Sequence, residues 1–148
     1  MTDTVMLTGA LTLIFAAAFA GAAIYINLVE HPARRELDDQ SLLAQWQPSY
    51  KRAFAMQASL ALMGGGFGIW AFYLGGDWRW VLGAIILIGN WPYTLLAITP
   101  LNNKLLALSP DAAVPETRAL LERWNRLHAV RSLLGGAATL CFLWVLTG

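Results

Sequence analysis

A histidine and an arginine lie within a stretch that is otherwise apolar enough to cross a membrane. Residues 128–147 have the length needed to span the hydrocarbon core, and they begin at His128 and include Arg131. An ionisable residue at such depth is costly and usually faces the interior of a helix bundle. Imidazole titrates near neutral pH, whereas guanidinium keeps its positive charge. Because Trp124, His128 and Arg131 are spaced i, i+4 and i+7, they share one helix face and form the first candidate for a functional site.

Further polar groups are expected to lie at the same depth. The ends of the first and third apolar stretches and the starts of the second and fourth should meet at one leaflet and surround a common cavity. The groups placed there are Asn27, Glu30, His31, Trp46, Tyr50, Gln57, Asn102, Trp124, His128 and Arg131. Each needs a polar partner in a medium of low dielectric constant. Glu30 is expected to pair with Arg131 or Arg52, and His128 to bond Asn102 or Glu30.

A purely structural role is the alternative for each of these groups. Arg131 alone is typical of a residue that extends its charge to the membrane interface or forms an ion pair there. Glu30 and His31 lie at a helix end, where water can solvate them. Asn90 and Thr94, which are deeper in the third stretch, are equally typical of a hydrogen bond between packed helices.

The elements that must position these side chains are membrane helices. The chain has 148 residues, of which 57% are hydrophobic and 13% are charged, about half the charged fraction of a soluble domain. Residues 5–29, 53–74 and 80–99 join 128–147 as stretches of about 20 residues or more, enough to cross about 30 Å of hydrocarbon. We therefore predict an all-α fold, an integral membrane four-helix bundle that forms a single domain over residues 1–148.

Lysine and arginine predict the orientation of this bundle. Nine of the ten occur in or beside the two long connections, and only Arg79 lies on the other side. The positive-inside rule then places both connections in the cytoplasm and both termini outside, with the bacterial inner membrane as the expected location. Residues 32–50 and 115–126 are amphipathic, so helices lying at or projecting from the membrane surface are expected there. From Pro115 the last helix can run unbroken for about 50 Å.

The sequence motifs indicate which cofactors and partners to expect. His31 and His128 are the only histidines, and no metal-ligand spacing occurs, so no metal site is expected. A haem bound by both histidines is conceivable in geometry, without a specific motif to support it. The chain has neither a phosphate-binding glycine loop nor a basic stripe, so nucleic acid is not expected as a partner. Membrane lipid, a hydrophobic aromatic molecule or a quinone, and a homo-oligomer or larger membrane complex are the expected partners.

Four short motifs mark the helix ends: V-E-H-P at 29–32, Y-K-R-A at 50–53, P-L-N-N-K-L at 100–105 and W-N-R-L-H-A-V-R at 124–131. Together they resemble the DUF1772 family, the anthrone oxygenase-like small integral membrane proteins, and the resemblance covers nearly the whole chain. It implies oxidation of a planar anthrone to an anthraquinone by dioxygen, with no established need for flavin, haem or metal. Family members are widespread, so the reaction for which the family is named need not be the reaction of this chain.

The resemblance also implies roles for the polar groups. His128 would remove the acidic methylene proton, Arg131 would stabilise the resulting oxyanion, and Asn102 would donate a hydrogen bond to it. Trp46 and Trp124 would stack on the ring system. The other expected substrate contacts are Asn27, Glu30, His31, Tyr50 and Gln57.

Two other functions stay open at this stage. The chain could be a non-enzymatic accessory subunit, or a module that binds quinone, lipid or haem, in a larger membrane complex. A transporter is disfavoured, because the polar groups cluster at one leaflet and do not line a path through the bundle.

Overall fold

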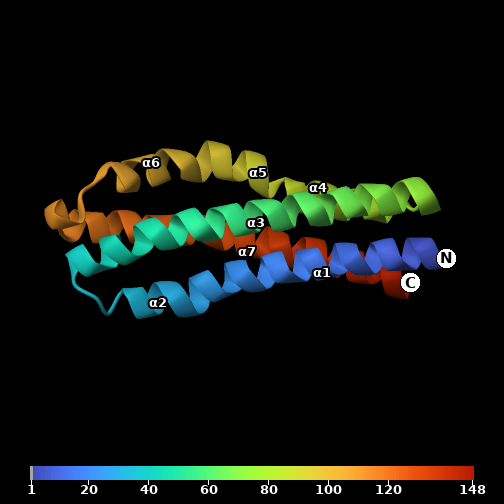
Figure 1. Cartoon of the computed structure of the whole chain (residues 1–148), viewed down its shortest axis with the longest axis horizontal. Helices are drawn as coiled ribbons and strands as arrows, with labels where there is room; N and C mark the ends of the chain where they lie inside the picture. Colours follow the sequence, from blue (N-terminus) through green and yellow to red (C-terminus); the bar gives the residue numbers. More distant parts are fainter. Residues whose placement is uncertain (1) are drawn as a thin grey trace.

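Four long helices make up the computed structural model, which describes residues 2–148 (Figure 1). Each is long and apolar enough to cross a membrane: Asp3–Arg34, Asp39–Gly75, Trp78–Ala107 and Pro115–Thr147, with 32, 37, 30 and 33 residues. No strand occurs within the described part of the chain. The all-α fold and its four membrane-spanning helices are therefore as predicted.

These helices contain shorter elements. The first comprises α1 (Asp3–Tyr25), the π-helical turn η1 (Ile26–Glu30) and α2 (His31–Arg34), and the second is α3 (Asp39–Gly75). The third comprises α4 (Trp78–Ile88), α5 (Asn90–Tyr93), the π-helical turn η2 (Thr94–Ile98) and α6 (Thr99–Ala107). A 3₁₀ turn, η3 (Pro110–Ala112), precedes the fourth helix, α7 (Pro115–Thr147).

Both chain termini lie at one end of the bundle, beside the tight turn at 76–77 (Figure 1). We call this the terminal end. The two longer connections, residues 35–38 and 108–114, lie at the opposite end, which we call the connection end. The amphipathic segments of the sequence are not separate surface helices, because α3 and α7 begin within them and continue unbroken. At 1.5 Å per residue α7 is about 50 Å long.

The terminal half of the bundle is a close-packed apolar core. Glycine allows the helices to approach there: a Cβ on Gly83 of α4 would lie 2.4 Å from the Phe142 ring of α7, and one on Gly64 of α3 would lie 2.7 Å from Leu87. Such contacts are typical of helix packing in lipid. The buried charged and amide side chains lie outside this core, from the middle of the helices to the connection end.

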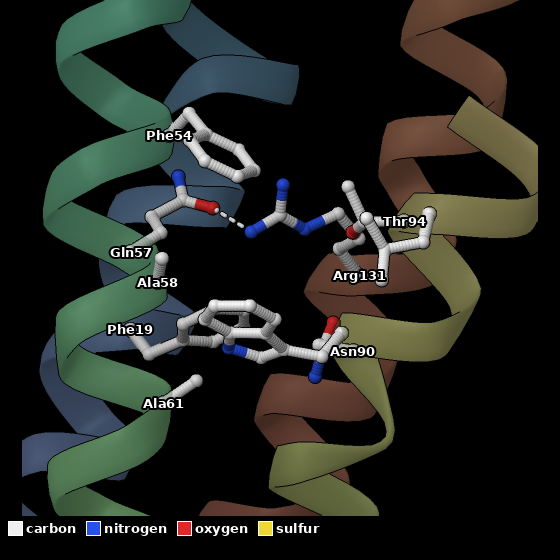
Figure 2. A pocket seen from close by; sticks show the side chains of 10 residues that line it. Phe19, Phe54, Gln57, Ala58, Ala61, Asn90, Thr94 and Arg131 are labelled. Carbon is white, nitrogen blue, oxygen red and sulfur yellow. Dashed lines mark hydrogen bonds between the residues drawn. The ribbon is translucent and has the colours of Figure 1, made fainter. Parts of the chain in front are cut away.

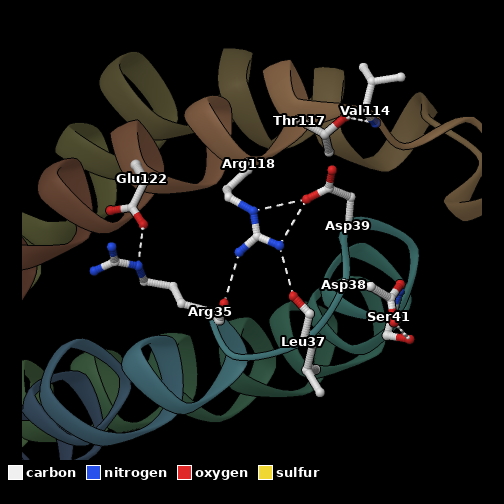
Figure 3. A network of polar contacts seen from close by, with 9 residues as sticks. All are labelled: Arg35, Leu37, Asp38, Asp39, Ser41, Val114, Thr117, Arg118 and Glu122. Carbon is white, nitrogen blue, oxygen red and sulfur yellow. Dashed lines mark hydrogen bonds and ion pairs between the residues drawn. The ribbon is translucent and has the colours of Figure 1, made fainter.

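Polar contacts hold the connection end together (Figure 3). Arg118 of α7 donates to the carbonyl oxygens of Arg35 at 2.9 Å and Leu37 at 2.7 Å, and it pairs with Asp39 at 2.8 Å. Asp38 caps α3 by accepting from the Ser41 backbone N–H at 2.9 Å. That bond and a second one from the Ser41 hydroxyl hold the pKa of Asp38 below its usual value. The start of α3 is thus fixed to α7.

The third helix breaks where its sequence contains Gly89, Asn90 and Pro92. Proline removes a backbone donor, which predicts a kink near Pro92. The observed break is at Gly89, between α4 and α5, and the Asn90 side-chain Nδ2 donates to the Leu87 carbonyl at 3.1 Å. Up to this break α4 packs along α3, whereas beyond it the helix diverges from α3 (Figure 1). The divergence leaves space between α3 and the segment formed by α5 and η2.

The first helix changes register at η1. From Val5 to Ile26 its buried positions recur every one to four residues, as one face of an α-helix requires, but the next buried position is His31, five residues on. The π-helical turn absorbs the extra residue, and such turns are frequent at functional sites. As a result His31 and Arg34 face inward instead of ending the helix in water.

Candidate functional site

His128 lies on α7 with 2% of its surface exposed. Asn27 of η1 determines which of the two imidazole nitrogens is protonated. The Asn27 amide nitrogen donates to the Asn125 backbone carbonyl at 2.9 Å, and a carbonyl can only accept. The Asn27 Oδ1 therefore faces His128 Nδ1 at 3.0 Å and accepts a hydrogen bond from the Nδ1–H group. In a neutral imidazole Nε2 is then unprotonated. It has no hydrogen-bond partner among residues 2–148, so a free base is available.

Arg131 is a buried cation without a counter-ion. Its exposed fraction is 7%, and no salt bridge to it occurs among residues 2–148. Nη2 donates to the neutral Gln57 Oε1 at 2.7 Å, and the guanidinium lies over the Phe19 ring, 5.5 Å from its centroid. Its Nε is buried without a partner. Since a desolvated charge is costly unless it is paired, this position favours an anionic ligand.

Three aromatic side chains support the imidazole. Trp46 stacks on Tyr50 at 5.0 Å between ring centroids, and Trp124 stacks on His128 at 4.9 Å. The two indoles meet edge to face at 5.6 Å. Asn102 joins the two pairs, because it donates to the Tyr50 hydroxyl and accepts from Trp124 Nε1, each at 2.9 Å. The rings form a continuous row from Tyr50 through Trp46 and Trp124 to His128, and this row sets the position of the imidazole.

The expected partners of Glu30 and His128 were wrong. Glu30 pairs with Arg34, one helical turn away, at 2.6 Å and not with Arg131 or Arg52. Arg34 is only 3% exposed, and Ser49 of α3 also donates to Glu30. His128 bonds Asn27 in place of Asn102 or Glu30. The pair of Glu30 and Arg34 follows their i, i+4 spacing, and the π-helical turn before it lets Arg34 face inward.

His31 is buried, and the residue it contacts on α7 is not one of those around His128. Its Nε2 is 3.6 Å from the Glu122 carboxylate of α7, which also pairs with Arg35 at 2.7 Å. It lines neither of the cavities described below. The two histidines therefore do not line the same one of these cavities.

Two small adjacent cavities occupy the bundle beside these groups. The inner cavity, about 10 Å³ in volume, is lined by seven of the ten predicted site residues: Glu30, Trp46, Tyr50, Gln57, Trp124, His128 and Arg131. Asn27 and Asn102 are not part of its lining but bond directly to residues that are. The lateral cavity, about 20 Å³, lies between α3 and α5–η2 (Figure 2). Phe54, Gln57 and Arg131 line both cavities and separate them.

Sequence reasoning missed several residues that shape the site. Ser132 donates to Asn27 Oδ1 at 2.6 Å, and Phe19 lies against Arg131. Ser132 is spaced i+4 from His128, a signal that could have revealed it. Arg34 was counted only as a charge of the connection, although its i+4 spacing from Glu30 is typical of an ion pair. Phe19 lies far away in sequence and had no such signal.

The fold and the site together define a small polytopic membrane protein with a buried histidine and a buried arginine near the middle of its last helix. The family model for anthrone oxygenase matches residues 46–141, and the chain belongs to this family. An anthrone oxygenase of Aspergillus terreus is 32% identical over 132 residues, which cover 82% of this chain and 88% of that protein. An anthrone oxygenase of Cryptosporiopsis sp. is 28% identical over 134 residues, or 81% of this chain and 77% of the relative. No solved structure matches the chain.

Proposed function

We propose that this protein oxidises an anthrone-type aromatic substrate with dioxygen, and that His128 and Arg131 carry the reaction. Family membership supports the reaction class, because the curated relatives described above are anthrone oxygenases. The observation that carries the assignment of residues is the buried, unpaired Arg131 beside a histidine whose Nε2 is free to accept a proton. A base and an anion-binding group are what deprotonation of an acidic C–H bond requires.

The methylene group of an anthrone is acidic because its conjugate base is an aromatic phenolate. His128 Nε2 takes the proton as the C–H bond breaks, and the electron pair spreads onto the ring oxygen. Arg131 stabilises that oxyanion in a site of low dielectric constant. The electron-rich anion then forms a C–O bond with dioxygen, and the proton held by His128 returns to the outer oxygen to give a hydroperoxide. Loss of the second methylene hydrogen as a proton, with cleavage of the O–O bond, leaves one oxygen as the new carbonyl and releases the other as water, so no external reductant is needed.

The remaining aromatic and amide groups act as positioning residues in this proposal. Asn102 donates one N–H to the Tyr50 hydroxyl and accepts from Trp124 Nε1, and it lines neither cavity, so it orients these two side chains. Trp46 and Trp124 pack on Tyr50 and His128 and hold the imidazole plane. The roles implied by the resemblance thus shift from substrate contact to support for these three residues.

The test is oxygen uptake by the purified chain in lipid nanodiscs with 1,8-dihydroxy-9-anthrone, corrected for empty discs. We expect His128→Gln and Arg131→Gln to fall to the rate of empty discs. Arg126→Gln, an exposed arginine on the same helix, serves as the matched control and should keep the activity of the unmodified protein. Each variant is compared by its melting temperature, so that loss of fold is separated from loss of chemistry.

Full turnover by folded His128→Gln would eliminate the assignment of the base. Absence of any turnover by the unmodified chain, together with co-purification of larger subunits in a fixed ratio, would instead support the accessory-subunit function. Native mass spectrometry of the protein extracted from its membrane measures that ratio.

A further inference from the structure

The lateral cavity concentrates buried polar atoms that have no hydrogen-bond partner. Five such atoms belong to its lining, and they come from three helices: Arg131 Nε, Gln57 Nε2, Asn90 Oδ1, Trp91 Nε1 and Thr94 Oγ1. In a membrane bundle no bulk water can satisfy them, and buried polar groups are nearly always paired. Their convergence on one cavity therefore indicates a ligand with polar atoms of its own.

We propose that the lateral cavity is a recognition subsite for the oxygen-bearing edge of a planar aromatic ligand that enters from the acyl chains. Asn90 and Thr94 are its specificity-determining residues. Figure 2 shows both side chains on the α5–η2 side of the cavity, facing Gln57 across it, with Arg131 between.

The orientation of each group fixes the chemistry of the ligand. Asn90 Nδ2 is held by the Leu87 carbonyl, so the free atom of this side chain is the acceptor Oδ1. Gln57 Oε1 is held by Arg131, so its free atom is a donor. Together with Arg131 Nε and Trp91 Nε1 the subsite offers three N–H donors, one hydroxyl and one acceptor. The complementary ligand carries carbonyl or phenolate oxygens and at least one hydroxyl group.

The walls of the cavity favour an aromatic body for this ligand. Phe19, Phe54 and Trp91 line it together with the polar atoms, and aromatic faces stack well on flat rings. A hydroxylated aromatic ketone or quinone has both properties: a flat apolar body and an oxygen-rich edge. An alkyl chain or a phosphate headgroup has only one of them.

The side of the cavity opens toward the surrounding lipid. Leu95, at its rim, is 54% exposed, and Phe54 and Ala58 are half-buried. At about 20 Å³ the cavity holds one water molecule and not a ring system. Phe54 lies between the lateral and inner cavities, so its rotation would join them. A ligand bound by its edge at Asn90 and Thr94 would then extend toward His128.

This inference rests on the proposed function in one respect, because the ligand of the subsite belongs to the class of molecule that the protein would oxidise. Binding can be measured without turnover, so the two proposals are tested separately. The experiment is equilibrium dialysis of 2-hydroxyanthraquinone and of anthraquinone against the full chain in nanodiscs, with empty discs subtracted. The two probes differ by one hydroxyl group. We expect the unmodified protein to bind the hydroxylated probe about tenfold more tightly, because buried polar groups reject a ligand that leaves them unpaired.

Asn90→Leu and Thr94→Val should each remove most of this preference. Thr139→Val is the matched control, because the Thr139 hydroxyl bonds its own helix at the Gly135 carbonyl and lies outside the cavity. Asn90→Leu also frees the Leu87 carbonyl, so Thr94→Val provides the decisive reading if the first variant fails to fold. Phe54→Ala should tighten the binding of both probes by enlarging the space.

Equal affinity of the unmodified protein for the two probes would overturn the subsite, as would an unchanged preference in folded Thr94→Val. Either result would mean that the cavity holds only water. The proposed function fails separately: selective binding without oxygen uptake would refute the oxidation and keep the subsite. Oxygen uptake that depends on His128, combined with unselective binding, would refute the subsite alone.

Discussion

Asn27 provides the sharpest test of how the base is prepared. In Asn27→Leu a side chain of similar size removes the acceptor that lies 3.0 Å from His128 Nδ1. A buried N–H without a partner costs about 1–3 kcal/mol. The imidazole can avoid that cost by moving its proton to Nε2, and it then has no free base on that nitrogen. In either case the reactive form becomes less favourable by about 2 kcal/mol, which corresponds to about a thirtyfold lower kcat.

The assay combines oxygen uptake in nanodiscs with ¹⁵N spectra of the imidazoles, which report the protonated nitrogen directly. The chain has two histidines, so a spectrum of His31→Gln assigns the His128 signals. We expect the unmodified protein to show Nδ1 protonated and Nε2 bare, and Asn27→Leu to show the opposite form or a mixture. Asn27→Asp keeps an acceptor and should recover part of the lost rate, which a pure packing role of Asn27 would not explain.

Asn103→Leu is the matched control, because Asn103 is an exposed asparagine next to the site. It should leave kcat and the ¹⁵N spectrum as in the unmodified protein. If folded Asn27→Leu turns over the anthrone at the original rate, or if the unmodified protein already carries its proton on Nε2, the reasoning about the base is refuted.

Three further predictions concern charge, packing and orientation. Arg131→Met should abolish oxygen uptake yet raise the melting temperature. A charged side chain at the centre of a membrane helix costs about 2.5–3.5 kcal/mol, and removing this cost outweighs the loss of one hydrogen bond. A lower melting temperature would show that the charge stabilises the fold. Gly83→Ala should lower the free energy of unfolding by about 1–3 kcal/mol in chemical denaturation, since its Cβ would lie 2.4 Å from an aromatic carbon. A Cβ on Gly136 meets open space, so Gly136→Ala should be neutral. Equal effects of the two variants would contradict the packing. In a cysteine-free background, Ser109→Cys should react with a membrane-impermeant maleimide only from the cytoplasmic side, and Gly148→Cys only from outside. The reverse pattern would show that the orientation is opposite to the one expected from the lysines and arginines.

Hydropathy and helical spacing could predict the spans and the shared face of α7, because both depend on local sequence. The four apolar stretches all became long helices, and the helix that begins at Pro115 continues without a break, as expected. Trp124, His128 and Arg131 are all buried, since spacing of i, i+4 and i+7 keeps them on one side of a straight helix. The depth of packing against other helices was beyond this reasoning.

The π-helical turn at Ile26–Glu30 explains why the partners were harder to predict. A pattern read at 3.6 residues per turn places the end of the first helix in water, with Glu30 free to reach another helix. The extra residue in η1 instead turns His31 and Arg34 inward, and Arg34 then takes the Glu30 carboxylate. Such a turn results from packing against other helices and leaves no regular spacing in the sequence.

The pairing of Glu30 also bears on the unpaired charge of Arg131. Of the residues that line the two cavities, Glu30 is the one carboxylate, and Arg34 together with Ser49 occupies it. A carboxylate paired with Arg131 would give a neutral pair with no attraction for an anion. Because the acid is bound elsewhere, the bundle keeps a desolvated cation beside a free imidazole nitrogen. That arrangement lowers stability in the empty protein and favours any ligand that becomes an anion when His128 removes its proton.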